Sequence, residues 1–187
     1  MAREWGEAIG DFLTRIIDLK GVSRRGWVVK LGVERPESVA DHSYAVALLA
    51  ALMARAEGLD PYRTAFLALV HDLHEVVTGD RLPGEPRSGE ESAVKALASG
   101  LPAELGGLIE GAWRDYWYSL VPEAKVVREA DRLDLAAQAL CYESQGYPAE
   151  ALDEFWRSAR RGVRSRLGIA ILRALRGRRK RKETSQV

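Results

Sequence analysis

All three histidines of this chain lie close to carboxylates in two short segments. His42 lies in ESVADHSYAVALL, while His71 and His74 lie in ALVHDLHEVVTGD, where Asp72 follows His71 directly. A third segment, READRLDLAAQAL, supplies Asp131. Two imidazoles and two carboxylates suffice to hold one catalytic divalent cation, with coordination positions left for water and substrate. The predicted ligands are His42, His71, Asp72 and Asp131.

This mixed set of nitrogen and oxygen ligands indicates which ions and which reaction to expect. It suits manganese, cobalt, nickel, iron or zinc better than calcium, and magnesium is a further option. Such an ion lowers the pKa of a bound water from about 15.7 toward about 7 to 9 and polarises a phosphoryl oxygen. The site therefore predicts hydrolysis of a phosphate ester through a metal-activated water.

Two of these positions have competing interpretations. Asp131 could instead pair with Arg128 or Arg132 on its own helix, and Asp134 lies one turn further along. The context ADRL favours Asp131. We expect His74 to be a structural residue on the helix flank.

The elements that position these residues are expected to be helices, because apolar residues recur at helical spacing nearly throughout the chain. One helix is predicted from near Ser38 to Gly58 and carries His42; Asp60 as N-cap and Pro61 then begin another, which carries His71 to near Gly79. The stretch RLPGEPRSGE is predicted to be a loop. Further helices are predicted at Glu90–Ala98, Ala103–Tyr118 and Pro122–Tyr142, with a last one beginning near Pro148. No alternating strand pattern occurs, so the predicted fold is all-α.

Length and composition favour one domain. The chain has 187 residues, of which 47% are hydrophobic, enough for one sizeable core. We expect this domain to span residues 1–175 and the basic residues 176–187 to form a disordered tail. The single cysteine cannot form an intramolecular disulfide, and no apolar run approaches the roughly 20 residues of a membrane span, so we expect a cytoplasmic protein. The absence of asparagine and the excess of arginine over lysine favour a thermophile, although a GC-rich genome produces a similar bias.

Longer segments around these residues resemble a known family. RRGWVVKLGVERPESVADHSY, LALVHDLHEVVTGD and PEAKVVREADRLDLAAQALCYE are similar to the HD-domain superfamily of metal-dependent phosphohydrolases, and most of all to its 5'-deoxynucleotidase branch. The similarity runs from about Ile16 to Tyr147. It implies a single helical bundle with the metal site among its central helices.

The resemblance also implies roles for the carboxylates of the second segment. The four predicted ligands would bind the metal. Glu75 would handle the proton of the attacking water, and Asp80 would lie close to the leaving group. Glu75 and Asp80 together could hold a second cation. From the residues alone, Glu75 could be an ordinary helix carboxylate and Asp80 could help to end the helix at Gly79.

For the substrate, the resemblance implies an arginine on the 5'-phosphate and an aromatic residue beside the sugar or base. Arg24 and Arg25 both fit the arginine, which suits bidentate phosphate binding. Trp27 fits the aromatic position, with core packing as an equally weighted alternative.

The implied activity is conversion of deoxynucleoside 5'-monophosphates to deoxynucleosides and phosphate, in a homodimer. Two alternatives stand beside it: another HD phosphohydrolase acting on nucleoside polyphosphates or cyclic nucleotides, and a non-catalytic helical protein that binds nucleic acid through RGRRKRK. Basic clusters bind phosphates without sequence preference. Because no aromatic residue is interleaved with these charges, we expect at most weak nucleic-acid contacts from the tail.

Overall fold

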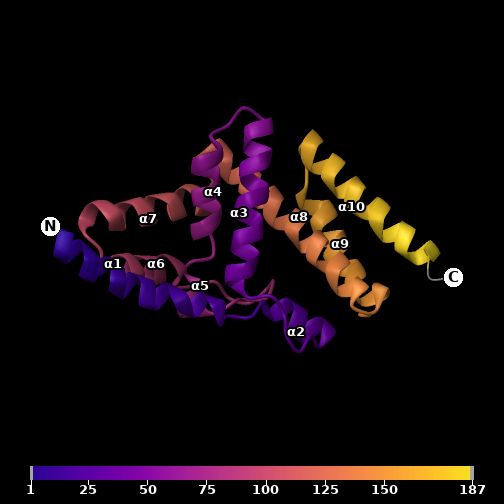
Figure 1. Cartoon of the computed structure of the whole chain (residues 1–187), viewed down its shortest axis with the longest axis horizontal. Helices are drawn as coiled ribbons and strands as arrows, with labels where there is room; N and C mark the ends of the chain where they lie inside the picture. Colours follow the sequence, from indigo (N-terminus) through magenta and orange to yellow (C-terminus); the bar gives the residue numbers. More distant parts are fainter. Residues whose placement is uncertain (1, 186–187) are drawn as a thin grey trace.

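Helices form nearly all of the structure, a computed structural model that describes residues 2–185, with side chains as far as Arg179 (Figure 1). In chain order these are α1 (Ala2–Ile16), a 3-10 helix η1 (Ile17–Lys20), α2 (Arg25–Leu31), α3 (Val39–Ala56), α4 (Pro61–Val70), α5 (Glu75–Thr78), α6 (Glu90–Ala98), α7 (Ala103–Trp117), α8 (Pro122–Ser144), α9 (Ala149–Gly162) and α10 (Arg166–Ser185). No strand occurs in residues 2–185, which confirms the all-α prediction. None of the helices in this part of the chain combines the length and apolar composition needed to cross a bilayer.

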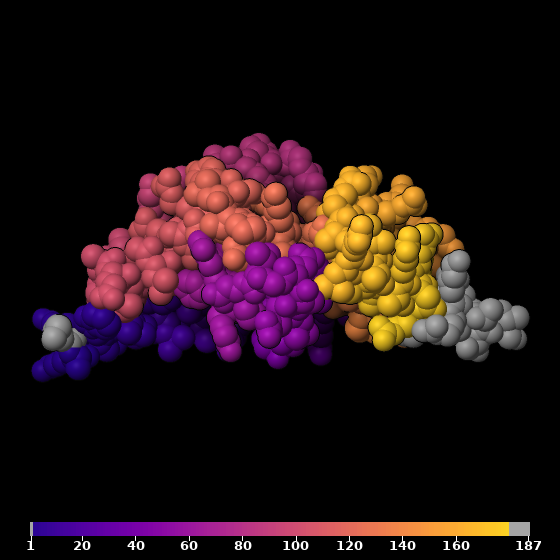
Figure 2. All heavy atoms as spheres, turned by 90° about the horizontal axis from the view of Figure 1, so that it is seen from above, coloured from indigo at the N-terminus to yellow at the C-terminus, as the bar shows by residue number. Residues whose placement is uncertain are grey.

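The long helix α8 lies at the centre and packs against α3, α4, α7, α9 and α10. It can do so because alanines occupy its buried faces: Ala124, Ala130, Ala136 and Ala139 are all fully buried. Small side chains allow several helix axes to approach closely, and the larger residues of the neighbours fill the remaining space. In Figure 2, α1 lies at one end of the molecule and α10 at the other, with the central helices between them.

The starts of α3 and α4 follow the sequence prediction. Ser38 caps α3 in a reciprocal capping box with Asp41, in which each side chain accepts a hydrogen bond from the other's backbone N–H. Asp60 caps α4, and Pro61 occupies its first turn. These caps fix where the helix that carries His42 begins.

The prediction of one helix over Asp60–Gly79 is wrong. Helix α4 ends at Val70, and residues 71–74 form turns before the short α5. The imidazole Nδ1 of His71 donates to the carbonyl oxygen of Ala68 at 2.6 Å, and the amide of Leu73 bonds three residues back rather than four. These local bonds compete with the helical pattern and turn the chain at the His-Asp pair.

The last helical segment also differs from its prediction, because the chain breaks between α9 and α10. The carboxylate of Glu129 on α8 accepts hydrogen bonds from the backbone amides of Arg164 and Ser165, both at 2.7 Å, and from the Ser165 hydroxyl. Ser165 Oγ in turn accepts from the amide of Gly168 and so caps α10. The expectation of one helix from Pro148 failed because this long-range contact is not visible in the local pattern.

Residues 176–185 are helical as part of α10, where the sequence predicts a disordered tail. The side chain of Arg179 anchors this part of the helix. Its guanidinium donates to Glu143 at 2.8 Å, to Asp153 at 2.7 Å and to the carbonyl oxygen of Ala149 at 3.0 Å. Residues 186 and 187 lie outside the described part of the chain.

Candidate metal centre

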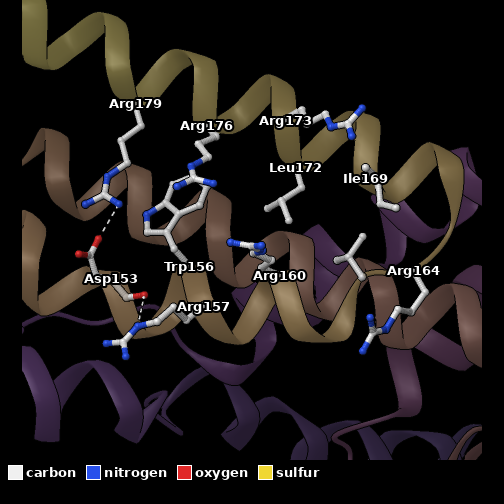
Figure 3. Close-up of a pocket in the computed structure, with 11 residues that line it drawn as sticks. Asp153, Trp156, Arg157, Arg160, Arg164, Ile169, Leu172, Arg173, Arg176 and Arg179 are labelled. Carbon is white, nitrogen blue, oxygen red and sulfur yellow. Dashed lines mark hydrogen bonds and ion pairs between the residues drawn. The ribbon is translucent and has the colours of Figure 1, made fainter.

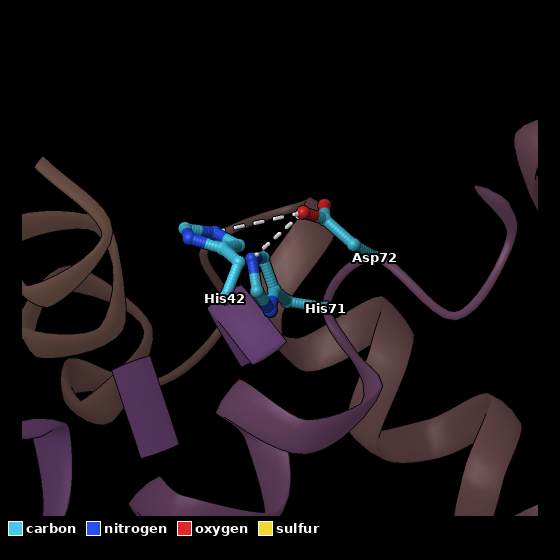
Figure 4. Close-up of side chains that lie close together, drawn as sticks. All are labelled: His42, His71 and Asp72. Atoms are coloured by element: carbon cyan, nitrogen blue, oxygen red, sulfur yellow. Dashed lines mark ion pairs between the residues drawn. The ribbon is translucent and has the colours of Figure 1, made fainter. Parts of the chain in front are cut away.

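The two predicted histidine ligands lie together in the interior, although they come from separate helical segments. His42 is on the second turn of α3, and His71 is in the turn after α4; each is 1% exposed. Their ring centroids are 5.4 Å apart. Asp72 Oδ2 lies 3.0 Å from His71 Nε2 and 3.9 Å from His42 Nε2. Figure 4 shows both imidazole rings turned toward the Asp72 carboxylate.

In both rings, Nδ1 is held by a hydrogen-bond partner outside the centre, and Nε2 faces the centre. His42 Nδ1 is 2.7 Å from the carboxylate of Asp134, and His71 Nδ1 donates to the carbonyl oxygen of Ala68. Because both partners are acceptors, the protons are assigned to Nδ1. The Nε2 atoms of both rings are buried without a hydrogen-bond partner among the described residues. Two inward imidazole nitrogens beside Asp72 suit a divalent metal ion, and Nδ1 is held from outside, as is usual for histidines that bind metals.

Asp131 and Asp134, the two candidates on α8, lie on opposite sides of the His42 ring. Asp131 Oδ1 is 3.4 Å from Nε2, on the side of Asp72, whereas Asp134 contacts Nδ1. Arg132 is 3.8 Å from the other oxygen of Asp131, and Arg128 instead bonds to the carbonyl oxygens of Tyr116 and Trp117. The geometry therefore brings Asp131 to the site and makes Asp134 the residue that orients His42.

The carboxylates at the centre outnumber its cationic side chains. Burial raises the pKa of Glu75, and the carboxylates of Asp72 and Asp80 raise it further, to about 9. Burial and Arg24 lower the pKa of His42, but the nearby carboxylates of Asp131 and Asp134 outweigh them and raise it to about 10. Both shifts mean that Glu75 and His42 each hold a proton at neutral pH unless another cation is present. This is the electrostatic environment that a divalent ion would satisfy.

Arg24 reaches the same centre through a backbone connection that the sequence does not reveal. The segment before α2 pairs with the start of α3, since the amide of Arg24 donates to the carbonyl oxygen of Glu37 and the amide of Val39 donates to that of Val22. The guanidinium of Arg24 is 3.4 Å from Asp72 Oδ2 and 3.8 Å from Asp80 Oδ1. Although burial opposes its charge, these carboxylates and Asp131 raise the pKa of Arg24, which keeps it protonated.

Arg25, the other candidate for the phosphate, points away from the centre. Its guanidinium forms a two-point ion pair with Glu85 in the loop after α5, at 2.8 and 3.1 Å. Its backbone amide donates to Asp80 Oδ2, and its side chain donates to the carbonyl oxygen of Asp80. Asp80 therefore holds the start of α2 in place and also contacts Arg24. Gly79, with φ of 68°, turns the chain so that α5 ends before Asp80.

Trp27 is a core residue with an edge on the cavity. It is 1% exposed, stacks on Phe155 with ring centroids 4.1 Å apart, and meets Tyr142 edge-on. Its indole Nε1 donates to Glu37 at 2.8 Å, an interaction that the sequence analysis missed. Tyr142 also accepts a hydrogen bond from the amide of Glu37. This network fixes the loop that carries Arg24.

His74 lies in the same turn, at a position where the sequence predicts a structural residue. It is 6% exposed, accepts a hydrogen bond from Trp113 at its Nδ1, and packs edge-on against Trp117. Burial lowers the pKa of His74, which favours the neutral ring. Its ligand atom also lies within reach of Asp72 and Glu75.

A cavity of about 730 Å³ opens onto the centre, a size typical of small-molecule sites. His71, Asp72, Glu75, Asp80 and Asp131 line its depth. Basic side chains from the loop after α5 and from α2, α8 and α9 surround them: Arg24, Lys30, Arg81, Arg87, Arg128, Arg132 and Arg161. The sequence analysis did not assign most of these cations to the site; the spacing of Arg128 and Arg132 around Asp131 was the one signal available. An acidic centre with a basic rim suits a cation together with a phosphorylated ligand.

Comparison with known proteins agrees with this geometry. The HD domain family matches residues 16–167. The bovine 5'-deoxynucleotidase HDDC2 is 37% identical over 153 residues, covering 79% of this chain and 74% of the bovine protein. The human 5'-deoxynucleotidase HDDC2 is 35% identical with the same coverage. Among solved structures, a conserved hypothetical protein from Pyrococcus furiosus superposes with a TM-score of 0.70 at 30% identity, covering 89% of this chain and 98% of that one.

The buried histidines and aspartates that the resemblance assigned to the metal lie inside the matched region, and so do Arg24 and Glu75. The expected family is thereby confirmed. This chain belongs to the HD domain family, in the group that contains the 5'-deoxynucleotidases HDDC2.

Proposed function

We propose that this protein is a metal-dependent phosphohydrolase that removes the 5'-phosphate from deoxynucleoside monophosphates. The observation that carries the proposal is the convergence of two free, buried imidazole nitrogens with Asp72, directly beside the protonated Arg24. Such a site offers positions for a divalent cation and for the phosphate that it would activate. The relatives named 5'-deoxynucleotidase support the nucleotide as the phosphate carrier.

His42, His71, Asp72 and Asp131 are the proposed metal ligands. When bound there, a divalent ion supplies an activated water at neutral pH and stabilises negative charge on the phosphoryl oxygens. Asp134 and the carbonyl oxygen of Ala68 hold the two imidazoles in the tautomer that binding requires. For the ion itself we propose manganese, cobalt, nickel, iron or zinc, with magnesium as the weaker alternative, because two of the four ligands are imidazoles.

Glu75 is the proposed acceptor of the proton of the attacking water. Its carboxyl is 7% exposed, and Oε2 is buried without a hydrogen-bond partner among the described residues, so one oxygen is free to accept a proton. Without a cation, burial and the neighbouring carboxylates raise its pKa to about 9; a divalent ion at the centre would favour the ionised carboxylate, which is the form that accepts a proton. Asp80 contacts Arg24, and we propose that it lies on the side of the leaving group. A second cation between Glu75 and Asp80 is the further expectation from the resemblance.

Arg24 is the proposed ligand of the 5'-phosphate. For Arg25 we propose a structural role, in which it holds the start of α2 against the loop after α5. Arg24 lies within reach of the metal carboxylates, whereas Arg25 is held by Glu85. Trp27 is buried and stacks on Phe155, which also lines the cavity, so we propose that it shapes the sugar or base pocket mainly by holding Phe155.

For the assembly we expect a homodimer. Three exposed apolar side chains, Tyr44, Leu48 and Leu52, recur at every fourth position along α3 and offer a surface for it. A cytoplasmic location and a thermophilic source are further expectations from the sequence. Sedimentation of the purified chain measures directly whether it forms a dimer.

The experiment that tests the function is phosphate release from each deoxynucleoside and ribonucleoside 5'-monophosphate. The protein is stripped with a chelator, and manganese, cobalt, magnesium or zinc is restored separately. We expect metal-dependent release with deoxynucleotides preferred, and loss of release in Asp72→Asn. The Glu110→Gln variant, on α7 and outside the cavity lining, is the matched control.

If no monophosphate is cleaved with any of these ions, the proposal fails. Hydrolysis of nucleoside polyphosphates or cyclic nucleotides would then identify another HD phosphohydrolase. Nucleic-acid binding without hydrolysis would favour the non-catalytic alternative.

A further inference from the structure

A second cavity lies between α9 and α10, away from the proposed metal centre. It has a volume of about 550 Å³ and shares no lining residue with the cavity at the metal centre. Arginines from both helices and their connection surround it, with Trp156 and Leu172 between them, as Figure 3 shows. The lining arginines are Arg157, Arg160, Arg164, Arg173, Arg176 and Arg179. We refer to this cavity as the arginine groove.

Most of this positive charge is not neutralised by the protein. Asp153 is the only carboxylate among the described residues of the lining, and Arg179 already binds it. Arg157 donates to a backbone carbonyl oxygen. The four remaining guanidiniums, those of Arg160, Arg164, Arg173 and Arg176, have no hydrogen bond or ion pair with side chains in the described part of the chain. Like charges held in one concave surface repel one another, so a bound anion would stabilise the groove.

The backbone of the two helices that carry these arginines is fixed at both ends of the groove. Glu129 fixes the turn between the two helices through the backbone of Arg164 and Ser165. At the other end, Arg179 ties α10 to Glu143 and Asp153 and lies 5.5 Å above the ring of Trp156. The groove is therefore built in advance, which lowers the ordering cost of binding.

The floor of the groove is apolar. Trp156, Val163, Ile169 and Leu172 line it, and the buried Nε1 of Trp156 has no hydrogen-bond partner among the described residues. A ligand that fits both features carries several phosphates for the arginines and a compact, partly apolar group for the floor. The volume suits one small molecule.

We propose that the arginine groove binds a nucleoside triphosphate, with the triphosphate against the unpaired arginines and the sugar or base on the apolar floor. Guanidinium groups bind phosphate oxygens through two parallel hydrogen bonds, so arginine suits this task better than lysine. The site is separate from the proposed catalytic centre and does not depend on the function proposed there.

Calorimetric titration of the full-length, metal-loaded protein with dATP and with inorganic triphosphate tests the proposal. The test variant combines Arg160→Gln and Arg176→Gln, and the matched control combines Arg166→Gln and Arg178→Gln, which removes the same charge from exposed arginines outside the groove. We expect the affinity for both ligands to fall by about tenfold or more in the test variant. We expect a fall of less than about threefold in the control, because charges outside the groove are screened by salt.

Equal losses in the two double variants would overturn the proposal, since they would indicate unspecific attraction to a basic surface. Binding of a single-stranded oligodeoxynucleotide without binding of dATP would overturn it in favour of a nucleic-acid surface. Absence of binding by any of these ligands would overturn it as well. Phosphate release from deoxynucleoside monophosphates should stay unchanged in both double variants, so the outcome is independent of the catalytic proposal.

Discussion

Asp134 on α8 lies 2.7 Å from Nδ1 of His42 on α3, and this contact decides which nitrogen of the ring faces the centre. Because a carboxylate accepts, Nδ1 carries the proton, and Nε2 is left to face Asp72 and Asp131. The same contact joins the two longest central helices at the site. Asp134 thus orients a proposed ligand without being one.

Replacing Asp134 with asparagine should therefore weaken metal binding while leaving the fold intact. The amide can donate to Nδ1 and so favour the wrong tautomer of His42. We expect the affinity for the ion, and with it the rate of phosphate release, to fall by about 10-fold to 100-fold. Titration of the chelator-stripped protein with cobalt or manganese measures this affinity. An unchanged affinity, with an unchanged circular dichroism spectrum, would show that the contact does not orient the ligand.

Removal of the metal should lower thermal stability. An ion that binds only the folded chain stabilises it by about 2.7 kcal/mol when its free concentration is 100 times the dissociation constant. For a domain of this size, the melting temperature should then fall by roughly 5 to 10 °C on chelation. Asp72→Asn should show almost no change on chelation. A wild-type melting curve that does not respond to chelator would contradict an ion held by these four residues.

Metal binding should also release protons, and the number released should depend on pH. Without a cation, the pKa of His42 is raised to about 10 and that of Glu75 to about 9, so both groups hold a proton at pH 7.5. A divalent ion favours their deprotonated forms and displaces these protons. As pH rises through 9 and 10, both groups lose their protons before binding, so release should decline and the apparent affinity should level off. Calorimetry in buffers of different ionisation enthalpy counts the protons; a count near zero at pH 7.5 would contradict this.

Much of the fold follows from local signals in the sequence. Ser38 with Asp41 and Asp60 with Pro61 predict the starts of α3 and α4, because a helix N-terminus needs side-chain acceptors close in sequence. The departures lie where a distant residue overrides the local pattern. Glu129 breaks the predicted last helix through the backbone at Arg164 and Ser165, which is far from it in sequence.

At the metal centre, too, local motifs predict some features and contacts between distant residues decide the others. His42, His71, Asp72 and Asp131 could be identified from residue type and motif, and the structure brings them together. Which of Arg24 and Arg25 faces the centre could not be predicted, because it depends on the pairing of the segment at Ser23 with Ser38 and on Glu85. Neighbouring residues of the same type are distinguished only by such tertiary contacts.

Glu129→Ala should destabilise the domain. The carboxylate accepts three hydrogen bonds at the start of α10, and these donors would lose their acceptor. At about 0.5 to 1.5 kcal/mol each, the free energy of unfolding should fall by roughly 1.5 to 4 kcal/mol. Urea unfolding followed by circular dichroism measures it. Glu104→Ala, at an exposed position of α7, is the control and should change stability by less than about 0.5 kcal/mol; equal effects in the two variants would argue against the Glu129 contact.

Arg24 and Arg25 provide a matched pair that separates phosphate binding from structural support. Lysine retains the charge of either residue but lacks the planar group that binds a phosphate at two points. Arg24 lies beside Asp72 in the cavity, so Arg24→Lys should lower kcat/KM for a deoxynucleoside monophosphate by about tenfold or more. Arg25 pairs with the partly exposed Glu85, an interaction that solvent screens, so Arg25→Lys should change kcat/KM by less than about fivefold. Steady-state kinetics on both variants test the assignment of Arg24 to the phosphate. Only a residue that contacts the phosphate should be sensitive to replacement of arginine by lysine, which keeps the charge. A larger loss of kcat/KM in Arg25→Lys would therefore assign the phosphate to Arg25.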